Sequence, residues 1–425
     1  MFARSGPLLS ELDRALPARP FAIECWDGGR LGSTTGDGPV FRVRSPAAVA
    51  HALRAPGQLG VGRAYVAGLL DPDDLDSALA LLSTWKPPPL TRAARARLAL
   101  AAARACGVMV PPRPPAGELR QRGHRHSRER DARAVRHHYD VSNEFFALFL
   151  DPSMTYSCAI FSRGAQTLAS AQAAKLELVC QKLALDAGKR VLDIGCGWGS
   201  FAIHAAKHHG AEVVGVTLSA PQAVLARRRV VEAGLQDRVE IRIADYREIT
   251  DGPFDAIASI GMIEHVGARQ IDAYAAQVAR LLRPGGQVLN HGIARLRVGD
   301  PEAGPFSERF VFPDAAPLHL STVIAALERA GLVTEHVEGF ADDYAETLAH
   351  WARRLDERRA EATALVGPER LRVWRLYLRA ARNGFLSGFT GVYQTRSSQP
   401  ASSGRPFRSE APDCSARAAR PLSSQ

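Results

Sequence analysis

Between residues 190 and 293, short apolar runs alternate with segments in which apolar residues recur at helical spacing. The runs predict strands at residues 190–195, 212–218, 239–243, 254–260 and 286–293, and the segments predict helices at 198–209, 219–233 and 268–282. Strands that alternate with helices of this length predict a parallel, doubly wound α/β sheet. Ligands bind such sheets beyond the carboxyl ends of the strands.

A glycine-rich turn follows the first of these strands. Residues 190–200 read RVLDIGCGWGS, and the run ends in Gly195, Gly197 and Gly199 before a helical pattern begins. Glycine has no Cβ to separate the backbone from a ligand, and the next helix offers free N–H groups at its start. The pattern therefore predicts a ligand-binding turn. The ends of the other predicted strands carry the polar residues Thr217, Asp245, Glu264 and His291.

The second strand argues against a nicotinamide cofactor. A dinucleotide-binding sheet carries an acidic residue at the end of that strand, where it holds the ribose hydroxyls. Here the strand ends in Val-Thr-Leu-Ser at 216–219, without a carboxylate. The glycine spacing, Asp-x-Gly-x-Gly-x-Gly from Asp193, is instead typical of S-adenosylmethionine-dependent methyltransferases.

The segments on either side of this sheet carry further patterns. Residues 168–185 predict a helix before the first strand, and residues 388–395 predict a last strand. Phe145, Phe146, Phe149 and Leu150 recur at helical spacing, which is typical of a core helix or of the wall of an apolar channel. The helices predicted within 344–389 carry many arginines, for most of which we expect a solvated face.

Breaks in the pattern divide the chain into four parts. Glycine-separated strands and short helices predict a small N-terminal α+β domain with a hairpin at 1–85. Proline, alanine and arginine dominate a linker at 86–133, which includes a predicted helix at 91–105. The methyltransferase domain is predicted at 134–395. A Ser-, Pro- and Arg-rich tail at 396–425 is predicted to be disordered.

Composition adds the charge pattern to this picture. The chain of 425 residues has a net charge of +10, and the segment from Lys86 to Arg136 alone carries thirteen Lys or Arg against three Asp or Glu. A local basic band suggests an anionic partner, either membrane phosphates or nucleic acid, although a solvated linker has the same composition.

Apolar content and cysteine spacing exclude some classes of protein. No apolar run approaches about 18 residues, so no transmembrane helix is expected, and the N-terminus does not read as a secretory signal. The six cysteines show neither paired metal spacing nor a disulfide framework. We therefore expect a cytoplasmic location.

Six motifs follow one another along the chain: HHYDVSNEFF, YSCAIF, VLDIGCGWGS, GVTLS, DYR and GMIEHVG. In this order and spacing they resemble the cyclopropane-fatty-acyl-phospholipid synthase family, which includes the mycolic acid cyclopropane synthases. The resemblance runs from about His137 to Tyr393, and LGVGRAYVAGLLD also looks like the N-terminal domain of the longer synthases. It implies a Rossmann-like class I methyltransferase fold with a doubly wound, mostly parallel sheet and a small N-terminal α+β domain.

The resemblance also implies an activity. The family transfers a methyl group from S-adenosylmethionine to a cis double bond of a lipid acyl chain, and the resulting cation loses a proton and closes to a cyclopropane. Bicarbonate is the family's general base. Its ligands correspond here to Cys158, Glu264, His291, Ile293 and Tyr344.

The same resemblance implies the contacts with the methyl donor. Together with Asp193, the three glycines of the turn approach the methionine part, and Tyr156 and Ser157 close over it. Thr217 and Gln222 take the ribose and adenine side, where Tyr246 and Arg247 flank the adenine. For Cys196 we expect packing inside the turn. No metal ligand is implied.

Several alternatives for the product and the partners stay open at this point. The same methyl transfer can end in a methyl-branched or methylene fatty acid. The expected partners are unsaturated phospholipid acyl chains and an anionic membrane surface, with peripheral attachment to the inner face of the membrane and a homodimer suggested by the family. A nucleic-acid partner is not expected, because the aromatic residues are not interleaved with the basic ones.

Overall fold

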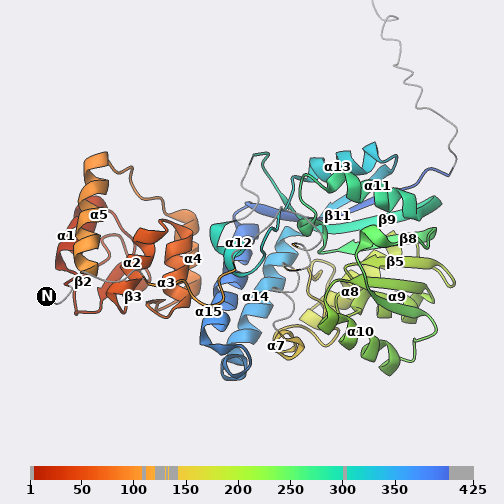
Figure 1. Cartoon of the computed structure of the whole chain (residues 1–425), viewed down its shortest axis with the longest axis horizontal. Helices are drawn as coiled ribbons and strands as arrows, with labels where there is room; N and C mark the ends of the chain where they lie inside the picture. Colours follow the sequence, from red (N-terminus) through yellow and green to blue (C-terminus); the bar gives the residue numbers. More distant parts are fainter. Residues whose placement is uncertain are drawn as a thin grey trace, which may run out of the picture.

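The computed structural model describes residues 4–107, 112–119, 130, 133, 142–299 and 304–401. These residues form a small N-terminal unit and a larger α/β unit, and the helices α14 (Ala341–Glu357) and α15 (Arg359–Leu386) stand between the two (Figure 1). Residues 137–141 of the HHYDVSNEFF motif, most of the predicted linker beyond residue 107 and residues 402–425 of the predicted tail lie outside the described residues.

A seven-stranded sheet organises the larger unit, in the order β10-β11-β9-β8-β5-β6-β7. Strands β5 to β9 run parallel to one another, whereas β11 is antiparallel to both β9 and β10. The prediction of a doubly wound, mostly parallel sheet is confirmed. The strands are β5 (Arg190–Ile194), β6 (Glu212–Thr217), β7 (Val239–Ile243), β8 (Phe254–Ile260), β9 (Leu282–Arg295), β10 (Val333–Gly339) and β11 (Thr390–Ser398).

Helices cover both faces of this sheet (Figure 1). The helices α8 (Leu168–Lys182), α9 (Ser200–His209) and α10 (Ala220–Glu232) pack on one face, and α11 (Ile271–Leu281) and α13 (Leu320–Arg329) on the other. Side chains of a strand alternate between the faces. On β5, Val191 therefore packs toward α8–α10 and Leu192 toward α11 and α13, which places Asp193 on the α8 side.

The last strands depart from the sequence-based prediction. Strand β11 extends to Ser398, so residues 396–398, which were predicted to open a disordered tail, pair with Leu289, Val288 and Gln287 of β9. Strand β10 was not predicted at all. Its sequence, VTEHVEG, is polar and mostly exposed, because β10 is the edge of the sheet and buries little of its surface. The remaining elements are the short helices α7 (Asn143–Ala147) and α12 (Pro305–Phe310) and the 3₁₀ turns η1 (Tyr246–Glu248) and η2 (Ile263–His265).

The N-terminal unit contains the predicted hairpin, with β1 antiparallel to β2, and two further strands in the order β2-β1-β3-β4. The helix predicted inside the linker is present as α5, but Ala101, Ala102 and Ala105 of that helix pack against Leu8 of α1. The packed unit therefore ends at Cys106 instead of residue 85, because alanines give α5 a buried face. Its elements are α1 (Gly6–Ala15), β1 (Ala22–Cys25), β2 (Arg30–Leu31), β3 (Val40–Val43), α2 (Pro46–Arg54), α3 (Gln58–Val66), β4 (Leu70–Pro72), α4 (Leu75–Thr84) and α5 (Arg92–Cys106).

An apolar contact joins the two units at α3. Tyr65 and Val66 pack against Phe306 and Phe310 of α12 and against Val373 of α15. A Cβ on Gly62 would lie 2.3 Å from the ring of Phe306, so a glycine is needed there for the close approach of the two units.

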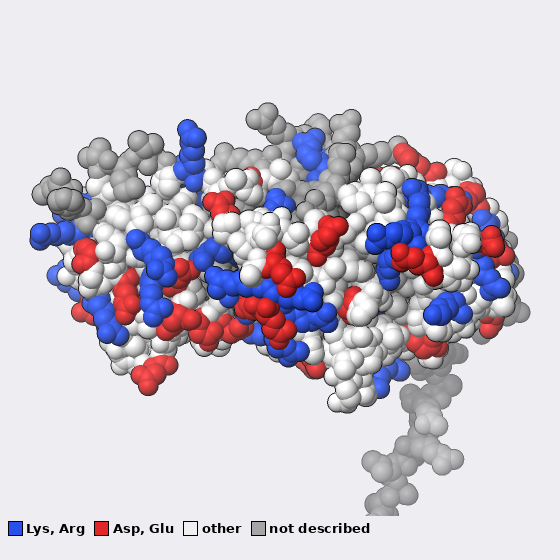
Figure 2. All heavy atoms as spheres, turned by 90° about the horizontal axis from the view of Figure 1, so that it is seen from below, with Lys and Arg blue, Asp and Glu red and all other residues white. Residues whose placement is uncertain are grey.

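Arginines of α15 form the ionic part of this contact. Arg379 reaches both Asp76 and Asp356 at 2.8 Å, Arg382 reaches Asp76 at 2.6 Å, and Arg372 pairs with Asp71. The prediction of a solvated face is wrong for these residues, because aspartates of the N-terminal unit and of α14 pair with them. Figure 2 shows basic and acidic side chains intermixed across the middle of the molecule's lower face. Within the part of the chain that the structure covers, no helix is long and apolar enough to cross a membrane.

Candidate active site

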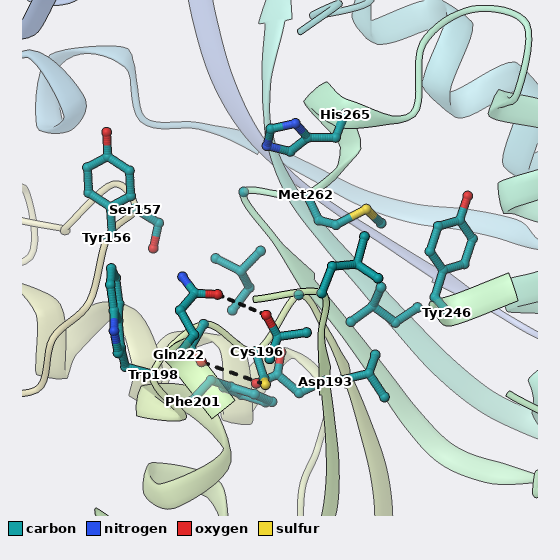
Figure 3. A pocket seen from close by; sticks show the side chains of 18 of the residues that line it. Tyr156, Ser157, Asp193, Cys196, Trp198, Phe201, Gln222, Tyr246, Met262 and His265 are labelled. Atoms are coloured by element: carbon teal, nitrogen blue, oxygen red, sulfur yellow. Dashed lines mark hydrogen bonds between the residues drawn. The ribbon is translucent and has the colours of Figure 1, made fainter. Parts of the chain in front are cut away.

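A cavity opens at the carboxyl ends of β5, β6 and β8, where the sheet topology predicts a ligand. In Figure 3, Tyr156 and Ser157 lie on one side of this cavity, Tyr246 lies on the opposite side and Asp193 lies at its base. We call this cavity the donor pocket. Of the residues predicted to contact the methyl donor, those lining it are Tyr156, Ser157, Asp193, Gly195, Gly197, Thr217, Gln222, Tyr246 and Arg247.

The glycine turn contributes backbone to the wall of the pocket. Gly195 has a φ of +80°, and a Cβ there would lie 3.2 Å from the Met262 side chain, which lines the same pocket. Gly199, by contrast, is the residue that precedes α9, and it lies against Ala226 of α10. It does not line the pocket, so its role is to start the helix and to let α10 pack closely.

Side chains beyond β6 and β7 form a hydrogen-bonded wall. Thr217 donates from Oγ1 to Oε1 of Gln222 at 2.8 Å, which leaves the Gln222 amide nitrogen free to face the glycine turn. Asp245 accepts from the guanidinium of Arg247 at 2.6 Å, and that guanidinium lies over the Tyr246 ring. Cys196, for which packing inside the turn was expected, and Trp198 are both buried and also line the pocket.

Lys175 of α8 is a pocket residue that the sequence analysis missed. Its ammonium is buried and donates to Ser157 Oγ at 2.8 Å, and it lines the pocket together with Asp193. Burial raises the pKa of Asp193 to about 7, an effect that the Lys175 charge opposes, and burial lowers the pKa of Lys175 to about 8. The only signal in the sequence was a lysine on the otherwise small and apolar face of a predicted helix.

The five residues predicted to hold bicarbonate gather next to this pocket. They are Cys158, Glu264, His291, Ile293 and Tyr344, and we call them the buried polar cluster, in which Ile293 takes part through its backbone N–H and both Ile293 and Tyr344 are partly buried. They come from four separate segments, and Phe340 lies at the centre of the contacts between them. Its carbonyl accepts from the Cys158 thiol at 3.7 Å and from the Tyr344 N–H at 3.0 Å, and its ring stacks on His291.

Glu264 is held by the backbone of β9. Its Oε1 accepts the Ile293 N–H at 2.7 Å, and its Oε2 is buried without a hydrogen-bond partner among the described residues. Burial raises the pKa of this carboxyl to about 7. The Ile293 N–H is thus engaged with Glu264 in this structure, which makes Ile293 a residue that positions the carboxylate.

His291 lies two residues before Ile293, so both side chains point to the same face of β9. Gln394 of β11 contacts His291 Nδ1 at 3.1 Å through its amide nitrogen, and the Gln394 oxygen accepts from Lys182 at 2.7 Å. Because Lys182 can only donate, it fixes the direction of the amide, and the amide N–H₂ then places the imidazole proton on Nε2. His291 Nε2 is buried and lacks a hydrogen-bond partner within the described segments. Burial, with the charges of Lys175 and Lys182, holds the pKa of His291 well below its usual value, so the ring is neutral.

The loop that carries Cys158 is fastened to α14. Asp343 accepts the N–H groups of Phe161 and Ser162 at 2.6 and 2.8 Å, and Thr347 accepts the Ala159 N–H at 3.0 Å. Burial raises the pKa of the Cys158 thiol well above its usual range, so Cys158 is a neutral donor. The loop therefore presents a thiol and not a thiolate to the cluster.

The aromatic residues predicted on either a core helix or a channel wall are core residues. Phe145, Phe146 and Phe149 are fully buried against Trp374 of α15, and they are not among the residues that line the donor pocket. Phe146 nevertheless contacts Tyr156 and Trp198, two residues of the pocket wall. The stripe therefore supports the pocket from behind.

This geometry sets what the site can do. Glu264 Oε2 can accept a hydrogen bond from a small ligand, and His291 Nε2 is a neutral donor that lacks a partner among the described residues. The single S–H of Cys158 is directed at the backbone carbonyls of Ala159 and Phe340. Two short segments of the chain contribute to both the donor pocket and the cluster. Ser157 lines the pocket and the next residue, Cys158, belongs to the cluster. Met262 lines the pocket, and Glu264, two residues later, belongs to the cluster.

Comparison with known proteins shows the family of this chain. Residues 126–395 match the family described as mycolic acid cyclopropane synthetase. A probable fatty acid methyltransferase of Mycobacterium tuberculosis is 38% identical, over 88% of this chain and 90% of that protein. The cyclopropane-fatty-acyl-phospholipid synthase of Escherichia coli is 35% identical, over 81% of this chain and 84% of that protein.

A solved structure extends the comparison to three dimensions. A mycolic acid cyclopropane synthase complexed with SAH and CTAB is 33% identical and matches with a TM-score of 0.60, over 63% of this chain and 98% of that one. That protein binds the demethylated form of S-adenosylmethionine, and the fold it shares with this chain is that of a class I methyltransferase.

Proposed function

The chain belongs to the mycolic acid cyclopropane synthetase family of S-adenosylmethionine-dependent methyltransferases, and from that premise we propose that it is a cyclopropane-fatty-acyl-phospholipid synthase. Its substrate is a cis double bond in an unsaturated phospholipid acyl chain. The observation that carries the proposal is the buried polar cluster beside the donor pocket. Methyl transfer alone needs the pocket, whereas ring closure also needs a group that takes up a proton.

The donor pocket holds and orients the methyl donor. S-adenosylmethionine, when bound, supplies an electrophilic methyl group on a sulfonium centre. An alkene is a weak nucleophile, so the rate depends on a fixed, close approach. The turn at Gly195 and Gly197 holds the methionine part, Tyr156 and Ser157 close over it, and Lys175 fixes Ser157 through their hydrogen bond.

Pocket residues on the far side bind the nucleoside. Thr217 and Gln222 take the place of the carboxylate that a nicotinamide-binding protein would carry after its second strand. Tyr246 and Arg247 flank the adenine. Because Gln222 is fixed by Thr217, its free amide nitrogen is a ready hydrogen-bond donor for the ribose side.

The buried polar cluster would hold bicarbonate, which supplies a base when bound. Glu264 Oε2 would accept its hydroxyl hydrogen and His291 Nε2 would donate to it, and Cys158 and Tyr344 would complete the set of residues that hold it. Ile293 positions Glu264 through its N–H. The methylated alkene carries a positive charge, so the surrounding residues must exclude water until a proton leaves. The packed aromatic core at Phe145–Phe149 serves that purpose by closing one side of the site.

Attachment to a membrane is the third part of the proposal. Arg92, Arg95 and Arg104 of α5 are exposed and belong to the basic segment at 86–136. We propose that this segment holds the protein at the inner face of an anionic bilayer, from a cytoplasmic location and as a homodimer. Binding to anionic vesicles should weaken as salt rises. Vesicle binding that does not change with salt would contradict attachment through the basic segment. The mass of the protein in solution, measured by light scattering, would test the homodimer.

Product analysis tests the central claim. The purified chain is incubated with unsaturated phospholipid vesicles, bicarbonate and labelled S-adenosylmethionine, and the lipids are analysed by mass spectrometry and NMR. A gain of one CH₂ together with cyclopropane protons is expected. Transfer of label to no lipid would refute the proposal.

A second candidate product is a methyl-branched or methylene fatty acid. The observation in its favour is the 38% identity to a protein named as a probable fatty acid methyltransferase. The same NMR spectrum decides, because a gain in mass without cyclopropane protons indicates this product.

A further inference from the structure

Four metal-binding side chains meet between α8 and α9, outside the donor pocket and the buried polar cluster. Glu177 and Cys180 lie three residues apart on α8, and His204 and His209 lie on α9. None of the four lines the donor pocket. The Cys180 sulfur and one nitrogen of each imidazole lie within 4.8 Å of one another.

Glu177 completes the arrangement. Its Oε2 contacts Nε2 of His204 at 3.2 Å and Nε2 of His209 at 3.0 Å. The side chains of His204 and His209 are mostly buried, and Cys180 is fully buried. The Glu177 carboxylate therefore contacts the same two imidazoles that lie together with the Cys180 sulfur between the two helices.

We propose that these four residues form a structural Zn²⁺ site. Zinc prefers thiolate, imidazole and carboxylate ligands in a tetrahedral arrangement, at about 2.3 Å for sulfur and about 2.0–2.2 Å for nitrogen and oxygen. Those bond lengths place the ligand atoms about 3.3–3.8 Å apart. The Glu177 contacts of 3.0 and 3.2 Å are close to that range, and metal binding would draw the Cys180 sulfur and the two imidazoles, which lie within 4.8 Å of one another, closer together.

The site would be closed, since protein atoms fill all four positions, and closed sites stabilise a fold instead of binding substrate. Its position explains what it would stabilise. Helix α8 carries Lys175, and α9 begins directly after the glycine turn. A metal bridge between these helices would therefore hold two walls of the donor pocket in a fixed relation.

Cobalt binding tests the proposal on the full chain, purified without a histidine tag and stripped of metal with a chelator. Tetrahedral Co²⁺ bound to a thiolate gives a charge-transfer band in the near ultraviolet and strong visible absorption. We expect one equivalent of Co²⁺ to produce both, Zn²⁺ to displace it, and either metal to raise the melting temperature. No thiolate band at stoichiometric Co²⁺ would overturn the proposal.

Variants locate the site. Cys180→Ser should lose the charge-transfer band, whereas Cys106→Ser, a buried cysteine of the N-terminal unit, should retain it. His209→Ala should weaken Co²⁺ binding at least tenfold, and His208→Ala, an exposed neighbour whose ring is 4.6 Å from that of His204, should not. A band that survives in Cys180→Ser, or equal losses in the two histidine variants, would overturn the assignment. If Cys180→Ser fails to fold, the comparison of the two histidine variants still decides.

Discussion

The donor pocket and the buried polar cluster adjoin each other, but they hold their polar groups in different ways. Apart from Asp193, whose Oδ2 is also buried without a hydrogen-bond partner among the described residues, the pocket relies on backbone geometry at Gly195 and on paired side chains such as Thr217 with Gln222. The cluster leaves one oxygen of Glu264 and one nitrogen of His291 buried without hydrogen-bond partners among the described residues.

This difference tells which changes each region tolerates. A buried polar atom without a partner costs stability, and a protein keeps such an atom where it has a task. Substitution of a single side chain in the cluster should therefore mainly lower kcat. In the pocket, changes to the backbone conformation should matter more, and they should mainly lower the affinity for the methyl donor.

Removal of the Glu264 carboxylate should give the largest effect. Glu264→Ala should lower kcat by about 10³-fold, because the site loses the acceptor that holds the base, while donor affinity stays within about threefold. Single-turnover methyl transfer and calorimetry with S-adenosylmethionine measure the two quantities. Glu212→Ala, an exposed carboxylate at the start of β6, is the matched control and should behave as wild type. A Glu264→Ala variant with activity within tenfold of wild type would refute the role.

A side chain at Gly195 should break the donor pocket instead. Gly195→Val forces a β-branched residue to a φ of +80° and pushes it against Met262, so donor affinity should fall about 100-fold. Calorimetry with S-adenosylhomocysteine measures the change.

Gly188→Val is the control for backbone strain in that experiment. Gly188 has the same φ of +80°, with nothing within 4 Å of its Cβ position, and it lies outside the pocket. The Gly188→Val variant should lower the melting temperature without weakening binding of the methyl donor. Equal losses of affinity in the two variants would show that strain alone explains the effect.

The amide of Gln394 should have an intermediate effect. Gln394→Leu removes the group that places the His291 proton on Nε2, so kcat should fall about tenfold with donor affinity unchanged. Nitrogen NMR of labelled histidine should show a shift toward the Nδ1–H tautomer. Gln181→Leu, on the exposed side of α8, is the control. An unchanged tautomer in Gln394→Leu would contradict the argument.

The pH dependence of stability should show the smallest effect. Burial raises the pKa of Glu264 from 4.5 to about 7, so the stability due to this group is fully present below pH 4.5 and is lost as pH rises through 7. Chemical denaturation from pH 5 to 8 should therefore show a steeper loss for wild type than for Glu264→Gln, by on the order of 1–3 kcal/mol. Parallel curves for the two proteins would mean that the carboxyl is not buried as a neutral group.

The donor pocket was largely predictable from the sequence, because it is built from residues that directly follow predicted strands. Strand identity depends on local apolar periodicity, and parallel topology brings all the carboxyl ends to one edge. The glycine turn, Thr217 and Asp245 were found in this way, whereas Tyr246 and Gln222 were implied by the family resemblance. Gly199 does not line the pocket and lies against Ala226 of α10, which the spacing of the glycines alone does not indicate.

The partners of the buried polar cluster were not predictable from local pattern. The five residues were identified by resemblance to a family, whereas Gln394, Lys182 and Phe340 carry no signal of their own. Lys175 reads as an ordinary helix residue until burial places it beside Asp193. The arginines of α15 likewise read as a solvated face until the N-terminal unit supplies Asp71 and Asp76.

The sequence by itself determined the order of strands and helices, the glycine turn and the polar residues that close each strand, because these depend on backbone propensity and on periodicity over a few residues. Only the tertiary structure decided the antiparallel edge at β10 and β11, the end of the N-terminal unit at Cys106 and the charge state of Glu264. Those features depend on burial and on pairing between segments far apart in the chain, and no local window of sequence contains both partners.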